Sequence, residues 1–192
     1  MRTYYEGRFG HGVPGRLAGW NDFEKRAIAT VASAEDARTG ALMPVNRFFN
    51  RVPGVGDQEH WQSEDYWATP AETIASNGAD CEDFAIAKYY TLKELGVPAS
   101  QLRLVYVRHA LVHEAHMVLA WYSAPGADPL ILDNLEDSIR PASQRPELQA
   151  VYSFNDEDLE VLRANAPSVR VSPASNRKWA IVLDKLQREL AF

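Results

Sequence analysis

Residues 77–84, Asn-Gly-Ala-Asp-Cys-Glu-Asp-Phe, contain the only cysteine of this 192-residue chain. The Asn-Gly pair predicts a turn, and the apolar spacing after it predicts a helix, so Cys81 falls at a helix start. Free N–H groups and the helix dipole favour negative charge at that position, which gives a cysteine more thiolate character. The stretch therefore indicates a cysteine nucleophile.

Three carboxylates, those of Asp80, Glu82 and Asp83, lie within two residues of this sulfur. Their charge opposes ionisation of the thiol, so we expect a cation to offset it. Calcium and magnesium prefer oxygen ligands, and one interpretation is that the three residues bind such a cation. The other is a capping box, in which Asp80 is the N-cap and Asp83 returns the bond. The two are compatible, because a capping carboxylate keeps one oxygen free.

The composition is that of an ordinary globular chain, long enough for a hydrophobic core, with 46% hydrophobic and 24% charged residues. A net charge of −6 argues against non-specific nucleic-acid binding. One cysteine excludes an internal disulfide. No apolar run is long enough for a transmembrane helix, and the N-terminus lacks the apolar centre of a signal peptide. We therefore expect either a cytoplasmic protein or a chain trimmed to its mature region.

The first half of the chain is predicted to be mainly helical. Residues 1–18 show no clear period, and we interpret them as an arm packed on the domain or partly disordered. A loop with Trp61, Tyr66 and Trp67 precedes a helix start at Thr69, where Pro and Glu follow at favoured positions. The predicted helices cover residues 21–33, 42–49, 70–76 and 81–95.

The second half is predicted to form a sheet, which makes the fold class α+β. Branched and aromatic residues predict strands over 102–107, 116–122 and 130–133. A short turn-rich connection indicates that the last two form an antiparallel hairpin. An edge strand over 152–154, a short helix over 156–164 and an amphipathic helix over 178–190 follow.

His116 begins one predicted strand and Asp133 ends the next, so an antiparallel hairpin places them side by side, over the start of the Cys81 helix. A cysteine nucleophile needs such a base and such an orienting group. Taken singly, His116 is more often a packed strand-end residue and Asp133 a turn residue. The order Cys, His, Asp makes the three together a candidate catalytic triad.

The competing interpretation is a metal site formed by the histidines, because four possible ligands lie close together in the sequence: His109, His113, Glu114 and His116. The helical zinc-peptidase pattern requires a histidine where this chain has Met117, and the segment is predicted to be a strand. We therefore expect no zinc site there.

The segments Gly78–Ala85, His116-Met117 and Leu132-Asp133-Asn134 resemble the bacterial transglutaminase-like cysteine proteinases, above all their LapG-type branch. The resemblance covers roughly residues 20–162. It implies a papain-like, transglutaminase-like core in which the nucleophile helix packs on an antiparallel sheet. With it we predict a single domain over 1–192, made of the arm (1–18), the cysteine proteinase core (20–162) and a C-terminal helix (176–192).

By the same resemblance, Cys81 is the nucleophile, His116 the base and Asp133 its orienter, while Asp80, Glu82 and Asp83 match calcium-binding acids. The backbone N–H of Cys81 is the natural oxyanion donor, with Trp67 or Tyr66 as a further candidate.

The resemblance implies a periplasmic, calcium-dependent endopeptidase that cuts a large LapA-like surface adhesin near its N-terminus between two alanines. Release of the adhesin would promote biofilm dispersal, and a LapD-like inner-membrane receptor for cyclic di-GMP would hold the protease inactive. Two alternatives stay open: a transglutaminase or amidase that passes the acyl group to an amine, and a binding module without catalysis. A periplasmic location requires that an export signal has been removed, and we expect a trimmed chain.

Overall fold

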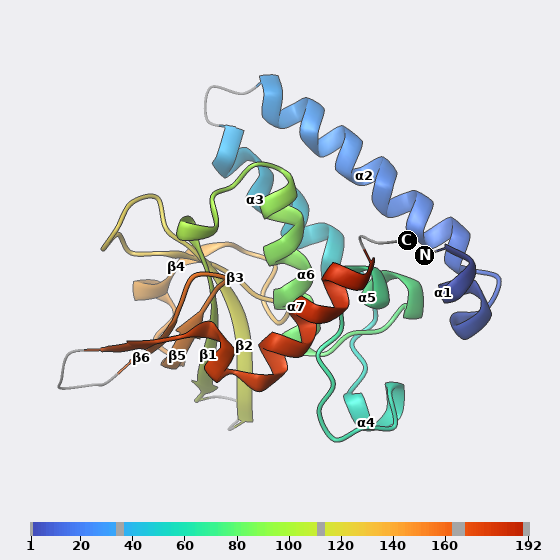
Figure 1. Ribbon diagram of the computed structural model, residues 1–192. Helices are drawn as coiled ribbons and strands as arrows, with labels where there is room; N and C mark the ends of the chain where they lie inside the picture. The colour runs from blue at the N-terminus through green and yellow to red at the C-terminus, as the bar shows by residue number, and fades with distance from the viewer. Residues whose placement is uncertain (1, 34–36, 111–113, 163–167, 190–192) are drawn as a thin grey trace.

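The computed structural model describes residues 2–33, 37–110, 114–162 and 168–189. Figure 1 shows the helices gathered on one side of the molecule and the strands on the other. Helix α6, which begins at Cys81, packs on β1 and β2 as well as on α3 and α5. The predicted α+β class, with the helix that begins at Cys81 packed on an antiparallel sheet, is confirmed. The α-helices are α1 (Arg2–Phe9), α2 (Val13–Ser33), α3 (Ala37–Phe49), α4 (Asp57–His60), α5 (Pro70–Ser76), α6 (Cys81–Glu94) and α7 (Arg177–Glu189).

The strands of the described residues form one seven-stranded sheet in the order β4-β3-β2-β1-β5-β6-β7. Every neighbouring pair is antiparallel. The strands are β1 (Leu102–His109), β2 (Glu114–Trp121), β3 (Leu130–Leu132), β4 (Arg140–Pro141), β5 (Leu148–Phe154), β6 (Leu159–Val161) and β7 (Val169–Val171). The described residues also form three 3-10 helices in the connections: η1 (Ala99–Gln101), η2 (Ala142–Gln144) and η3 (Pro173–Ser175).

We predicted an arm over 1–18, packed on the domain or partly disordered, and in the structure residues 2–9 form α1 and residues 13–18 open α2. The helix predicted over 21–33 is the second part of α2, which begins at Val13. Tyr5 and Val13 are buried against Ala71 and Ala75 of α5. Burial of these side chains stabilises helices whose glycines lower their intrinsic propensity.

Local signals predicted the two helices that lead to the site. The Thr69 hydroxyl accepts from the Glu72 N–H at 3.2 Å, and Glu72 Oε2 accepts from the Thr69 N–H at 3.0 Å, which is a complete capping box. Asn77 ends α5 in the left-handed region at φ 59°, where asparagine is tolerated better than most residues. Helix α6 then begins at Cys81, as predicted.

The predicted hairpin is also confirmed. Strands β2 and β3 pair so that Leu119 lies opposite Leu132 and Ala120 opposite Ile131. Extension of this register beyond β3 places Asp133 opposite Val118, one diagonal step from His116, within reach of a hydrogen bond between side chains.

Two predictions about the later strands are wrong. Residues 152–154 belong to β5, which lies between β1 and β6 inside the sheet and not at its edge. The helix predicted over 156–164 is replaced by β6, and residues 163 and 164 lie outside the described ranges. Asn155 Oδ1 accepts from the N–H groups of Glu157 and Asp158 at 2.9 and 3.1 Å. This asparagine turn reverses the chain and ends the run that we read as helical.

Helix α7 confirms the amphipathic helix predicted over 178–190. Its Trp179 and Val182 are fully buried in the main core. Within the described residues, no helix combines the length and the apolar character needed to span a membrane.

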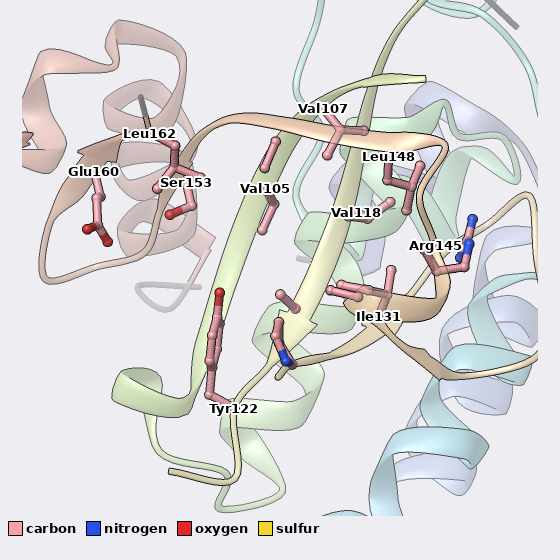
Figure 2. Close-up of a pocket in the computed structure, with 14 residues that line it drawn as sticks. Val105, Val107, Val118, Tyr122, Ile131, Arg145, Leu148, Ser153, Glu160 and Leu162 are labelled. Carbon is pink, nitrogen blue, oxygen red and sulfur yellow. The ribbon is translucent and has the colours of Figure 1, made fainter. Parts of the chain in front are cut away.

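The two faces of the sheet bury different apolar sets. Leu104 and Leu119 point into the main core under the helices. The opposite face carries a separate cluster and a cavity of about 130 Å³, shown in Figure 2. The cluster consists of Val105, Val107, Val118, Ala120 and Ile131.

Candidate active site

A short parallel bridge holds the start of α6 beside the segment that follows α3. The Val55 N–H donates to the Ala79 carbonyl at 2.9 Å, and the Ala79 N–H donates to the Pro53 carbonyl at 3.1 Å. The His60 ring packs so closely on Gly78 that a Cβ there would lie 2.5 Å from His60 Cε1. A side chain at this position would collide with the ring, so the close contact requires glycine. The bridge holds α4 near the acidic start of α6.

Cys81 is the first residue of α6 and is only partly buried. Its Sγ donates to Glu82 Oε2 at 2.9 Å, while the backbone N–H of Met117 on β2 donates to the sulfur. Burial raises the pKa of the thiol above its ordinary value, the Glu82 and Asp80 carboxylates raise it further, and the Met117 N–H acts in the opposite direction. The charge conflict predicted from the sequence is present in the structure.

His116 and Asp133 lie side by side, as predicted. His116 Nε2 is 2.8 Å from Asp133 Oδ1, and both side chains are buried. Because a charged carboxylate is an acceptor, it fixes the imidazole tautomer with the proton on Nε2. Nδ1 is then the ring nitrogen that can accept a proton.

The Asp133 carboxylate has partners on both oxygens. Oδ1 also accepts from the Leu135 N–H at 3.0 Å, and Oδ2 accepts from Arg145 Nη2 at 2.7 Å. Burial alone would raise the pKa of Asp133, but the hydrogen bond and charge of His116, the Leu135 N–H and Arg145 together hold that pKa below its usual range. Asn50 Nδ2 donates to the Asp133 carbonyl at 2.9 Å and fixes the backbone as well.

A second group of carboxylates surrounds the start of α6. Asp57, Asp80 and Asp83 each offer one oxygen, and these oxygens lie within 4.8 Å of one another. Each residue also has one buried oxygen without a hydrogen-bond partner among the described residues: Asp57 Oδ1, Asp80 Oδ1 and Asp83 Oδ2. The other oxygens are held, since Asp83 Oδ1 accepts from the Ala68 N–H at 2.6 Å and Asp57 Oδ2 accepts from the Tyr66 N–H.

The capping interpretation of Asp80 and Asp83 is only half right. Asp83 accepts a hydrogen bond from the Asp80 N–H, but the Asp80 side chain makes no capping bond. Burial and neighbouring carboxylates raise the pKa of Asp80 to about 9 and that of Asp83 to about 8. Three clustered carboxylates, two of them buried and the third partly buried, with an unpartnered oxygen on each in the part of the chain described, fit a hard divalent cation such as calcium.

Of the predicted metal ligands, Asp80 and Asp83 belong to this group and Glu82 does not. Glu82 contacts the Asp80 side chain and the Cys81 thiol instead. Asp57 is the residue that sequence reasoning missed. Its only local signal is that it opens a short helix after Pro53-Gly54-Val55-Gly56, and its contact with Asp80 depends on the long-range bridge.

The aromatic residues proposed as oxyanion donors have different surroundings. The Tyr66 hydroxyl donates to Glu72 Oε1 at 2.6 Å and is thus committed to α5. Trp67 stacks on Phe154, and its indole N–H is buried without a partner. Of the crowded histidines, His109 packs edge-on against His116, and His113 lies outside the described residues.

Comparisons with known proteins agree with this geometry. Residues 22–154 match the family described as bacterial transglutaminase-like cysteine proteinase. The structure is similar to Legionella pneumophila LapG in its EGTA-treated form, with a TM-score of 0.81 and 35% identity over 96% of this chain and 94% of that one. It is also similar to calcium-bound Legionella pneumophila LapG, with a TM-score of 0.77 and 36% identity over 96% of each chain.

No curated protein sequence matches the chain. The family match nevertheless covers more than half of its residues, and the similarity to Legionella LapG extends over nearly all of both chains. The single cysteine at the start of α6 receives a hydrogen bond from Met117, the residue that follows the buried His116, which agrees with this family. The chain belongs to the bacterial transglutaminase-like cysteine proteinases.

Proposed function

We propose that the protein is a calcium-dependent cysteine endopeptidase that uses Cys81, His116 and Asp133. One observation carries the proposal: the buried His116–Asp133 hydrogen bond of 2.8 Å lies directly beside Met117, whose backbone N–H donates to the Cys81 sulfur. The nucleophile, the base and the group that orients the base are therefore contributed by α6, β2 and the end of β3.

Each side chain has a defined step. Asp133 holds Nε2–H of His116, so Nδ1 takes the proton from Cys81 and the thiolate attacks the scissile carbonyl carbon. The carbonyl oxygen becomes an oxyanion, for which the backbone N–H of Cys81 at the helix start is the proposed donor. His116 then protonates the leaving amine, the peptide bond breaks, and water hydrolyses the thioester with His116 again as base.

We propose Asp57, Asp80 and Asp83 as the calcium ligands, and Glu82 stays a predicted ligand that the variants below test. When bound, calcium would supply positive charge beside the thiol. That charge would offset the carboxylates that now raise the pKa of Cys81. Glu82 would no longer need to accept the thiol proton, which leaves Cys81 available to His116.

The proposed substrate is a large LapA-like surface adhesin, cut between two alanines near its N-terminus. We further propose a periplasmic location, and inhibition by a LapD-like receptor when cyclic di-GMP is abundant. The similarity to Legionella LapG and the motif around Cys81 support these proposals. Cleavage at this site would release the adhesin and disperse the biofilm.

The test is cleavage of an adhesin N-terminal fragment that contains an Ala-Ala site, in calcium and in chelator, with products sized by mass spectrometry. We expect two fragments whose summed mass exceeds the substrate by one water, formed only with calcium. Cys81→Ala and His116→Ala should lower the rate by at least about a thousandfold. His11→Ala is the matched control, since His11 is fully exposed and its loss should change nothing.

Other outcomes separate the alternatives. A product joined to an added amine, without chain cleavage, would favour a transglutaminase. Binding of the fragment with no change in mass would favour a module without catalysis. Cleavage that survives Cys81→Ala would remove the nucleophile from the proposal.

A further inference from the structure

We propose that Arg145 is a positioning residue for the catalytic histidine: it locks the Asp133 carboxylate in the orientation that holds His116. The inference rests on the proposed function, since it concerns the same histidine. Sequence reasoning did not single out Arg145, which lies in a polar stretch between β4 and β5.

The contact between Arg145 and Asp133 is buried. Arg145 Nη2 lies 2.7 Å from Asp133 Oδ2, and the side chains are 3% and 0% exposed. His116 and the Leu135 N–H occupy the other oxygen, Oδ1. Because the partners are divided between the two oxygens, the plane of the carboxylate is fixed, and so is the direction in which it accepts from His116.

Arg145 is itself held on two sides. Its Nε donates to Glu147 Oε1 in a salt bridge, and its backbone N–H donates to the Ala142 carbonyl at 2.9 Å. The Ala142 N–H donates in turn to the Pro129 carbonyl at 2.8 Å, which ties η2 to the start of the β3 hairpin. The guanidinium therefore has little freedom to leave Asp133.

The arginine stem lies on the face of the sheet away from α6. Figure 2 shows Arg145 at one end of the apolar cavity there, with its nitrogens turned away from Val105. Val118 and Ile131 line the same cavity. Val118 follows His116 by two residues on β2, and Ile131 of β3 precedes Asp133 by two residues. The stem thus packs on apolar side chains while the charged end reaches Asp133, a division that arginine allows.

Asp133 needs a hydrogen-bond donor on its second oxygen, because a buried carboxylate bonded through one oxygen can turn away from His116. Without Arg145, Asp133 Oδ2 would be buried without a partner, and the carboxylate could rotate or take up a proton. Either change weakens the bond to His116 Nε2 and lets the ring leave the position in which Nδ1 faces the nucleophile. Because this bond orients the base and is not a contact with the substrate, we expect the loss to fall on kcat.

The test compares Arg145→Met, Arg145→Lys and Arg140→Met in the calcium-loaded protein with the adhesin fragment. Methionine keeps the apolar stem without a donor, and lysine keeps the charge with a single donor. Arg140 is the control, because it pairs with Glu136 at 3.0 Å on the half-exposed strand β4. We expect Arg145→Met to lower kcat by about 10- to 100-fold with KM within twofold, Arg145→Lys to recover much of that loss, and Arg140→Met to match wild type.

A second readout is the exchange of the His116 Nε2 proton with water, followed by NMR and assigned as the signal that His116→Gln removes. Arg145→Met should accelerate this exchange at least about tenfold, because the acceptor is no longer fixed. If the wild-type protein cuts no substrate, the proposed function fails, while the exchange rate still tests the role of Arg145.

The Glu147→Gln variant keeps the proposal testable if Arg145→Met does not fold. Glu147 is partly exposed and holds Arg145 from outside, so its change should lower kcat by about threefold at unchanged KM. A folded Arg145→Met protein with kcat within twofold of wild type and unaltered proton exchange would overturn the proposal. If that variant does not fold, wild-type kcat in Glu147→Gln would overturn it equally.

Discussion

The buried Asp133 carboxylate and the group formed by Asp57, Asp80 and Asp83 differ in how their oxygens are used. Both oxygens of Asp133 have hydrogen-bond partners, and its pKa is held below the usual range. Asp57, Asp80 and Asp83 each keep one buried oxygen without a partner, and burial together with mutual repulsion raises their pKa values. Asp133 thus has a partner for each oxygen, whereas the group of three keeps oxygens that no described residue occupies.

From this difference we expect calcium to act on Cys81 and not on His116. The contacts of His116 with Asp133, and of Asp133 with Arg145, involve none of the three clustered acids, so we expect them to hold with or without a cation. Cys81 instead donates to Glu82 and lies beside uncompensated carboxylates. We therefore expect calcium removal to silence the nucleophile while the base stays in place.

Among the variants that test this comparison, Asp83→Asn has the largest expected effect. The new side chain still accepts from the Ala68 N–H but loses the charge and a strong cation ligand. In wild type, calcium at about 100 times its Kd should stabilise the fold by about 2.7 kcal/mol, a rise in Tm of roughly 5–10 °C. Asp83→Asn should abolish that rise, and calcium-supported cleavage should fall by at least about 100-fold.

Two further variants decide which acids bind the cation. Asp57→Asn should reduce the calcium-induced rise in Tm as strongly as Asp83→Asn, since both belong to the group of three. Glu82→Gln should keep most of that rise, because Glu82 accepts a hydrogen bond from the Cys81 thiol and does not belong to the group of three. A lost response in Glu82→Gln with a normal response in Asp57→Asn would reverse our assignment, and differential scanning fluorimetry distinguishes the cases.

The pH dependence of stability should also differ with and without calcium. Asp80 and Asp83, with pKa values of about 9 and 8, keep protons in the folded protein that the unfolded chain releases near pH 4. The folded state thus binds more protons between these values, so the stability of the calcium-free protein falls as pH rises from about 5 to 8.

Calcium requires the deprotonated acids, and its binding opposes this trend. The calcium-induced rise in Tm should therefore grow from pH 5 to pH 8, by about 3–6 °C. The measurement uses protein stripped of metal on a chelating resin, so that no chelator titrates in the same range. A rise in Tm that is equal at both pH values would mean that these aspartates are already ionised without the cation.

Local signals in the sequence were sufficient for the elements that carry Cys81, His116 and Asp133. The capping box at Thr69 and the apolar spacing after Cys81 are short-range patterns, and the turn before β3 fixes its hairpin. These elements form because neighbouring residues agree with the final packing. The nucleophile helix and the histidine–aspartate pair could therefore be predicted.

Asp57 and Arg145 could not be predicted in the same way, because contacts between distant segments place them. Asp57 reaches the acidic group through the bridge between Gly54 and Ala79, and Arg145 reaches Asp133 from the segment after β4. Neither residue lies in a periodic pattern. Helix α1 was missed for a related reason, since its buried Tyr5 packs against Ala71 and Ala75 of α5, which are distant in the sequence, as well as against nearby Val13.

Substitution of Lys88 should have the smallest effect on catalysis. It tests whether His116 depends on positive charge near Asp133 or on the hydrogen bond that Arg145 donates to it. Its side chain is 1% exposed on α6, and burial lowers its pKa to about 7, although Asp133 and Asp137 act in the opposite direction. Its ammonium thus faces the same carboxylate as Arg145. Unlike Arg145, it is not among the residues that hydrogen-bond to Asp133 in the described structure.

Lys88→Met should therefore change stability and leave catalysis nearly intact. The unfolded chain binds the lysine proton up to about pH 10.4, whereas the folded protein releases it near pH 7, so the lysine costs stability at neutral pH and costs less as the pH rises. We expect Lys88→Met to raise the unfolding free energy by about 1–2 kcal/mol at pH 7, less at pH 9, with kcat within threefold of wild type. Urea unfolding at both pH values, alongside the cleavage assay, makes the comparison. A loss of kcat as large as that of Arg145→Met would show that charge near Asp133, and not the bond to its Oδ2, is what His116 requires.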